Sequence, residues 1–173
     1  MQILLTRQVV KSLRRELRRA GRREIGGLLM GEHVRDEVFR VISISVQRSG
    51  GSQASFVREP QEHHAQLQKF FARTDADYTR FNYLGEWHSH PSFESAPSNT
   101  DLRTMQSIVD DPSVGANFLV LMIPRLGKRG TVELTATVIR RGGLPFPASV
   151  LADQDEAQSN GFAFRCVRRI FRL

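Results

Sequence analysis

The chain has 173 residues, of which 40% are hydrophobic and 25% charged. These proportions are typical of a globular protein large enough to bury its own core, and they exclude a disordered or fibrous chain. The longest purely apolar run, Phe118 to Ile123, is much shorter than the roughly 20 residues of a membrane-spanning helix, so no membrane association is predicted. The single cysteine, Cys166, excludes an intramolecular disulfide and favours a cytoplasmic location.

The net charge is +7, and arginine carries most of it. One basic cluster comprises Arg7, Lys11, Arg14, Arg15, Arg18, Arg19, Arg22 and Arg23, and a second comprises Arg165, Arg168, Arg169 and Arg172. Such patches attract nucleic acid, anionic lipid or an acidic protein, although a solvated helix face explains them equally simply.

The first half of the chain alternates helices with strands. Thr6 can cap a helix from Arg7 to Ala20 that Gly21 closes. Predicted elements then follow in the order strand Glu24–Gly31, strand Val38–Val46, loop Arg48–Ala54, strand Ser55–Arg58 and helix Pro60 to about Arg73. Three glycines in the first of these strands would let another backbone or a ligand come close.

The second half continues this alternation. Its predicted elements are strand Asn82–His90, loop Ser92–Pro97, helix Asn99 to about Val109, strand Asn117–Ile123, strand Thr131–Arg140 and loop Gly142–Pro147. Interleaved strands and helices predict an α/β domain with a mixed central sheet flanked by helices. We expect the domain to occupy residues 1–150 and residues 151–173 to form a basic segment that packs on it or extends it.

A candidate metal site follows from His88, His90 and Asp101. Residues i and i+2 of a strand point to the same side, so the two imidazoles project together. Asp101 falls in the first turn of the following helix, after a ten-residue excursion that can fold back. Two imidazoles and one carboxylate suit Zn²⁺ with one position left for water, although ligand type alone admits iron or manganese. The other histidines, His33, His63 and His64, are interpreted as ordinary surface or core residues.

Hydrolysis at such a centre needs a base, and two glutamates compete for this role. Glu24 begins the glycine-rich strand, whereas Glu86 shares a strand face with His88 and His90. Sequence spacing does not decide between them. Ser98 and Asp101 form a capping-box pattern, and the Ser98 hydroxyl could also stabilise an oxyanion.

Together these residues resemble a known signature. Glu24-x-Gly-Gly-Leu-Leu-x-Gly, followed by His88-x-His90-Pro91-x6-Ser98-x2-Asp101, is similar to the JAMM motif of JAB1/MPN metallopeptidases. The resemblance implies a cytidine-deaminase-like layered sandwich with one Zn²⁺ per chain, held by His88, His90 and Asp101. It implies that Glu24 is the general acid/base and that Ser98 supports the oxyanion, which leaves Glu86 an auxiliary or structural role.

The resemblance also suggests substrates and partners. Active members cleave isopeptide or peptide bonds after the C-terminal tail of ubiquitin or a ubiquitin-like protein. Residues 55–58 and 83–91 look most like bacterial stand-alone members that accompany E1-like and E2-like enzymes in antiphage operons of the CBASS and Bil types. Two alternatives remain, a catalytically silent MPN scaffold and a RadC-like DNA-associated protein. Nucleic acid is the disfavoured partner because the basic helix carries no stacking aromatics.

Overall fold

A single mixed sheet organises the fold of the chain. The computed structural model describes residues 1–48, 60–153 and 165–166. Its strands are β1 (Gln2–Leu5), β2 (Gly26–Arg35), β3 (Val38–Ile44), β4 (Phe81–His88), β5 (Phe118–Leu126), β6 (Val132–Arg140), β7 (Phe146–Pro147), β8 (Ser149–Ala152) and β9 (Arg165–Cys166). The helices are α1 (Arg7–Ala20), α2 (Pro60–Arg73) and α3 (Asn99–Asp110), with a short 3₁₀ turn, η1, over Lys128–Gly130.

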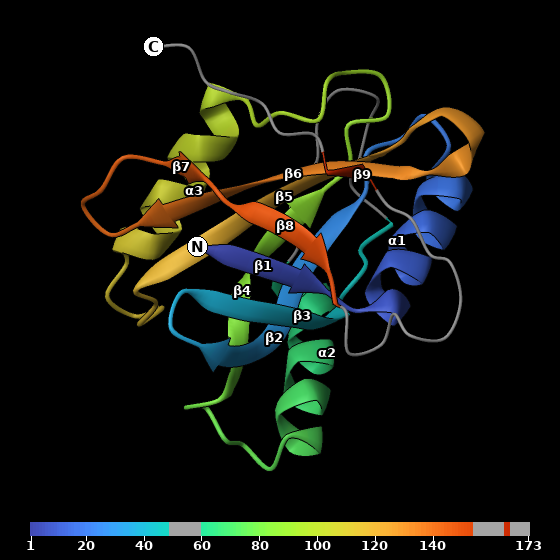
Figure 1. Cartoon of the computed structure of the whole chain (residues 1–173). Coiled ribbons are helices and arrows are strands. Elements are labelled where there is room, and N and C mark those ends of the chain that lie inside the picture. The colour runs from blue at the N-terminus through green and yellow to red at the C-terminus, as the bar shows by residue number, and fades with distance from the viewer. Residues whose placement is uncertain (49–59, 154–164, 167–173) are drawn as a thin grey trace.

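The strand order in the sheet is β7-β6-β5-β4-β2-β3-β1-β8, and β9 pairs with β6 (Figure 1). Pairs β1–β3, β1–β8, β4–β5 and β6–β9 are parallel and the others are antiparallel. The predicted α/β class with a mixed central sheet is therefore confirmed. The apolar strand β5 lies between β4 and β6, an interior position that fits its continuous hydrophobic run.

Helix α1 follows the predicted boundaries. The Val9 N–H donates to the hydroxyl of the N-cap residue Thr6 over 3.3 Å, and the helix ends at Gly21, whose φ is +63°. Val9, Leu13 and Leu17, which recur every four residues and so form one apolar stripe, are buried. This stripe packs against one face of the sheet with core residues such as Ile25, Leu29, Trp87, Val120 and Met122.

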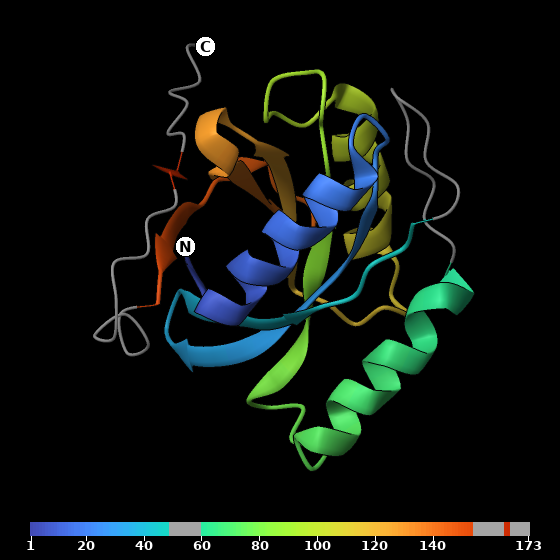
Figure 2. The ribbon, with the colours of Figure 1, turned by 90° about the vertical axis from the view of Figure 1, so that its right-hand side faces the viewer.

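Helix α3 contributes to a second core. Met105 and Val109 pack with Leu119, Leu121, Ile123 and Ile139, which are the alternate residues of β5 and one residue of β6. Because successive strand residues point to opposite faces, α1 and α3 cover opposite faces of β5. Figure 2 shows α1 in front of the sheet, with α3 behind it. Within the described residues, every helix is too short or too polar to cross a bilayer.

Several sequence predictions need correction. Residues 2–5 form β1, a strand that was not predicted, and residues 146–147 of the predicted loop form β7. Strand β2 begins at Gly26 and runs to Arg35, so it lies further along the chain than predicted. The predicted strand over residues 55–58 and most of the loop before it lie outside the described residues.

The division at residue 150 stays a prediction, since most of the segment after it is not described. Strand β8 nevertheless runs through Ala152, and Asp153 is buried with its carboxylate 2.7 Å from Arg40 Nε. The ordered sheet therefore continues past the predicted boundary.

Candidate metal centre

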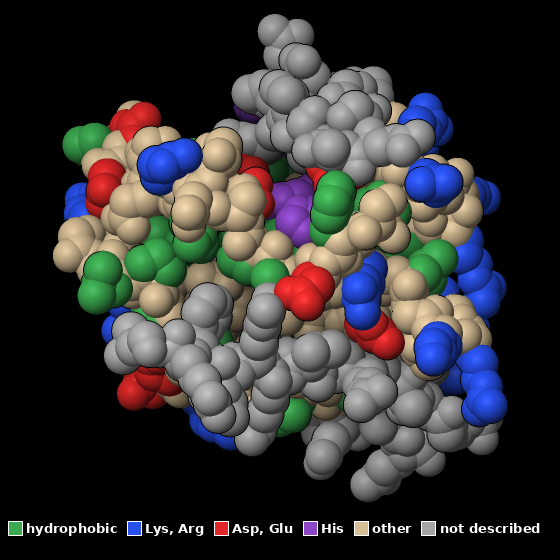
Figure 3. Space-filling model, turned by 90° about the horizontal axis from the view of Figure 1, so that it is seen from above, with side chains coloured by type: hydrophobic (Ala, Val, Ile, Leu, Met, Phe, Trp, Pro, Cys, Tyr) green, Lys and Arg blue, Asp and Glu red, His purple; other side chains and the backbone are tan. Residues whose placement is uncertain are grey.

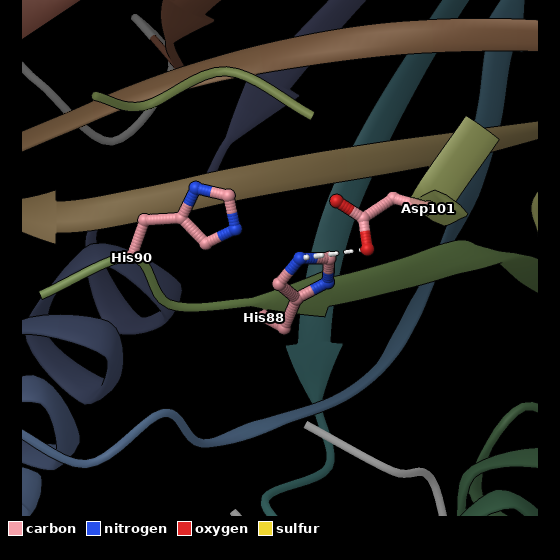
Figure 4. Close-up of side chains that lie close together, drawn as sticks. All are labelled: His88, His90 and Asp101. Atoms are coloured by element: carbon pink, nitrogen blue, oxygen red, sulfur yellow. Dashed lines mark ion pairs between the residues drawn. The ribbon is translucent and has the colours of Figure 1, made fainter. Parts of the chain in front are cut away.

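His88, His90 and Asp101 meet at one end of β4. His88 is the last residue of that strand, His90 follows in the loop, and Asp101 lies in the first turn of α3. One ligand atom from each residue lies within 4.8 Å of the others, and His88 Nε2 is 3.5 Å from Asp101 Oδ1 (Figure 4). The structure thus brings together the three side chains that the sequence grouped.

A backbone contact fixes the orientation of His90. Its Nδ1 lies 3.1 Å from the carbonyl oxygen of Glu94. A carbonyl only accepts hydrogen bonds, so Nδ1 is the donor of this bond, and Nε2 is the ring nitrogen left to face a metal. In Figure 4 the His90 ring turns a nitrogen toward Asp101. This polar support for a ligand imidazole is the usual arrangement in protein metal sites.

Asp101 is held by the capping box that the sequence predicted. The Ser98 N–H donates to Asp101 Oδ2 over 2.7 Å, and the Asp101 N–H donates to Ser98 Oγ over 3.1 Å. Burial alone would raise the pKa of Asp101, but hydrogen bonds with His88 and Ser98 and the charge of His88 hold it well below its ordinary value. Asp101 therefore remains an ionised carboxylate.

Glu24 reaches the site through the pairing of β2 with β4. Gly26 is opposite His88 at the end of the ladder, and beyond it the Ser89 N–H donates to the Ile25 carbonyl, which places Glu24 one residue further toward the histidines. Burial raises the pKa of Glu24, which is only 4% exposed; the charges of His90 and His88 lower it in part, and that of Asp101 raises it. A buried carboxylate coupled to all three candidate ligands fits a proton-transfer role.

Sequence reasoning missed Ser89, the residue between the two histidines. Its side chain is fully buried, and its Oγ accepts a hydrogen bond of 3.0 Å from the Ile25 N–H. The Ser89 N–H donates to the Ile25 carbonyl over 2.8 Å. Ser89 thereby joins the residue next to Glu24 to the segment that carries His88 and His90. The available signal was its position, because a residue between two site-facing strand residues points into the core.

The glycines of β2 predicted that another backbone segment lies close to this strand, and the prediction is confirmed at Gly27. A Cβ at this position would collide with the carbonyl of Ser45. Ser45 Oγ accepts from the Leu28 N–H over 2.7 Å and lies 2.7 Å from Nδ1 of the buried His63. His63 is therefore a core residue, as interpreted from the sequence, and helps to hold the strand that begins near Glu24.

Glu86 does not join the three candidate ligands. It lies opposite Leu28 in the sheet, and its Oε1 accepts a hydrogen bond of 3.3 Å from the Tyr83 hydroxyl. Among the described residues, the group able to hold a metal consists of His88, His90 and Asp101 without it.

The donor set fits zinc. Zn–N and Zn–O bonds are about 2.0–2.2 Å, so two ligand atoms of a tetrahedral centre lie about 3.4 Å apart. The observed 3.5 Å between His88 Nε2 and Asp101 Oδ1 agrees with that spacing. Two imidazoles and one carboxylate also leave a coordination position for solvent, as catalytic zinc sites require.

An exposed aromatic side chain stands at the edge of the site. Phe93 is 53% exposed, and its ring centroid lies 6.4 Å from that of His90. The Phe93 carbonyl accepts a hydrogen bond from Arg125, and the Ser95 carbonyl accepts one from the Thr135 hydroxyl. Strands β5 and β6 thus anchor the loop that carries Phe93.

Comparison with known proteins identifies the family. Residues 6–137 match the family described as prokaryotic homologs of the JAB domain. Because the match spans well over half of the chain, the protein belongs to this family. The family-level resemblance inferred from the motif is confirmed.

Several individual proteins are similar to this chain. A CD-NTase/cGAS isopeptidase from Enterobacter hormaechei is 28% identical over 143 residues, covering 83% of this chain and 78% of its own. A protein from Desulfitobacterium hafniense, solved in solution, has 20% identity and a TM-score of 0.62, covering 88% of this chain and 93% of its own, and shares the fold. A JAB1/MPN domain protein from Archaeoglobus fulgidus, solved by crystallography, has 16% identity and a TM-score of 0.46, with coverages of 87% and 98%.

Proposed function

We propose that the protein is a zinc-dependent isopeptidase or peptidase that cleaves after the C-terminal tail of a conjugated protein. The observation that carries this proposal is the buried Glu24 carboxylate, electrostatically coupled to the His88, His90 and Asp101 group. A structural zinc site would be closed by a fourth protein ligand and would have no use for a neighbouring base.

Each residue of the site has a chemical role in this proposal. His88, His90 and Asp101 would hold Zn²⁺, which when bound supplies Lewis acidity to water and to the scissile carbonyl. Glu24 accepts a proton from the attacking water and delivers it to the departing amine. Burial favours the first step, because a carboxylate with a raised pKa is a stronger base and accepts a proton more readily. Ser98 donates its hydroxyl proton to the developing oxyanion, while its oxygen caps α3.

The substrate is proposed from the relative. The name CD-NTase/cGAS isopeptidase points to an isopeptide bond that involves a CD-NTase. We propose that this bond joins the C-terminal carboxyl group of the CD-NTase to a lysine side chain. A ubiquitin-like protein conjugated in the same way is the alternative, and reversal of conjugation or maturation of a precursor would both use this chemistry. Association with E1-like and E2-like enzymes, a role in antiviral defence and a cytoplasmic location belong to the same proposal.

The non-catalytic alternative fits the site less well. A silent scaffold has no need for an ionised Asp101, an oriented His90 and a buried Glu24 in one place. A DNA-associated protein would bind DNA through the basic surface of α1.

The decisive experiment compares two matched variants. The substrate is a CD-NTase joined through its C-terminal carboxyl group to the lysine side chain of a fluorescent peptide. Glu24→Gln should lower kcat about 10²- to 10⁴-fold while retaining about one zinc per chain, because it removes the base and keeps its shape. Glu86→Gln should cleave normally, and His88→Ala should lose both zinc and activity. Normal cleavage by Glu24→Gln, or metal-free wild-type protein indifferent to zinc, would refute the proposal.

A further inference from the structure

A cluster of basic side chains lies beside the candidate metal centre. We define this arginine surface by residues from the second half of α1, its exit turn and η1, namely Arg14, Arg18, Arg22, Arg23, Lys128 and Arg129. Looking down on the face that contains the site, Figure 3 shows lysine and arginine side chains gathered along one side of the histidines.

Tertiary structure assembles this surface from two distant segments. A Cβ on Gly130 would lie 2.5 Å from Nη2 of Arg18 and 3.5 Å from Nη2 of Arg14. The 3₁₀ turn that carries Lys128 and Arg129 therefore sits against the arginine face of α1. Two basic segments that are distant in the sequence therefore form one continuous positively charged surface.

The cations of this surface are available to a partner. Glu16 is the acidic residue of α1, and it is buried and already paired with Arg15, Arg19 and Arg48. The six residues of the arginine surface form no ion pair with any other residue in the described part of the chain. Arg14 and Arg18 also lie four residues apart on one helix, where like charges repel and destabilise the helix.

The arginine surface adjoins Glu24 in the chain. Arg23 is the chain neighbour of Glu24, so their Cα atoms are about 3.8 Å apart, and Arg22 is at most about 7.6 Å away. These spacings are within the Debye length of about 8 Å at physiological salt, so the charge acts on a molecule bound at the site. A solvated helix face would have no reason to end at the catalytic glutamate.

We propose that the arginine surface binds an acidic face of the folded protein substrate and so presents its C-terminal tail to the metal centre. The inference deepens the proposed function and rests on it. A protein is favoured over nucleic acid because the proposed function of the adjoining site acts on a protein, and because neither α1 nor η1 carries an aromatic side chain. Single-stranded nucleic acid would find no stacking platform there.

The test separates docking from chemistry by using two substrates. One is the folded CD-NTase conjugate described above, and the other is a ten-residue peptide of the same tail joined to the same lysine peptide. Arg18→Glu/Arg22→Glu should raise KM for the folded conjugate by about tenfold or more and flatten its salt dependence, with kcat little changed. The short peptide should be cleaved as by the wild type, because it does not reach the surface.

A matched control carries the same change in net charge elsewhere. Arg35→Glu/Arg73→Glu reverses two exposed arginines, one at the end of β2 remote from Glu24 and one at the end of α2. This control should retain the wild-type KM for both substrates. Arg18→Gln/Arg22→Gln, a milder change, should give an intermediate KM if the reversed variant folds poorly.

The other results of these assays separate the docking inference from the proposed function. An unchanged KM for the folded conjugate in the reversed variant would overturn the docking inference while leaving the proposed function intact. Loss of affinity for a 30-base-pair DNA duplex with that unchanged KM would reassign the surface to nucleic acid. If the wild type cleaves neither substrate, the proposed function fails. Anisotropy binding of the folded conjugate, measured with and without the charge reversal, then decides the docking inference separately.

Discussion

Replacing Ser89 with alanine should weaken the fold and the chemistry together. The change removes the oxygen that accepts the Ile25 N–H over 3.0 Å, in a place where Ser89 is fully buried. An unsatisfied buried N–H costs about 1–3 kcal/mol of the free energy of unfolding. For a chain of this length that loss lowers the thermal midpoint by about 2–12 °C. Urea unfolding with a linear extrapolation measures the free energy directly.

The same substitution should also reduce catalysis, because the lost bond holds the residue beside Glu24. A displacement of about 1 Å in a reacting group lowers the rate by about 100-fold, so we expect kcat to fall between tenfold and about 100-fold. Ser107→Ala is the control, since it removes an exposed hydroxyl that donates to the Thr104 carbonyl and should change stability by less than about 0.5 kcal/mol. Lower stability with unchanged kcat would refute the positioning role of Ser89, and unchanged stability would refute the hydrogen-bond argument itself.

Three further predictions concern the metal, pH and backbone. Zinc at 100 times its Kd should raise the free energy of unfolding by about 2.7 kcal/mol over chelator-treated protein, and thermal unfolding should show no such gain in His88→Ala. Burial raises the pKa of Glu16, but arginine hydrogen bonds and charges outweigh it and lower the pKa below 4.5. Glu16 thus stabilises the fold above about pH 4.5, and this contribution is lost as pH falls through the lower folded-state pKa. Unfolding free energies measured from pH 6 to pH 2 should fall more steeply in the wild type than in Glu16→Gln; parallel curves would contradict this. Gly85→Ala should destabilise the fold by at least about 1–3 kcal/mol, because φ is +141° and a Cβ would meet the Val120 carbonyl; an unchanged thermal midpoint would contradict this.

Local sequence patterns were sufficient to predict features whose contacts join residues that are close together in the sequence. Thr6 and Gly21 bounded α1 because caps bond to neighbouring backbone groups. His88 and His90 are two residues apart, at the end of β4 and just beyond it, and the Ser98–Asp101 capping box depends on one helical turn. These features, with the family motif, indicated the fold class and the candidate metal ligands.

Tertiary structure alone decided the features that depend on pairing between distant segments. Strand β1 was missed because its partners are β3 and β8, and nothing local distinguishes such a short apolar segment from a loop. Spacing left Glu24 and Glu86 as equal candidates. The β2–β4 register, fastened by Ser89, carries Glu24 to the histidines, since a one-residue slip would turn its side chain to the other face. The contact between α1 and η1 likewise joins two basic segments that the sequence keeps more than a hundred residues apart.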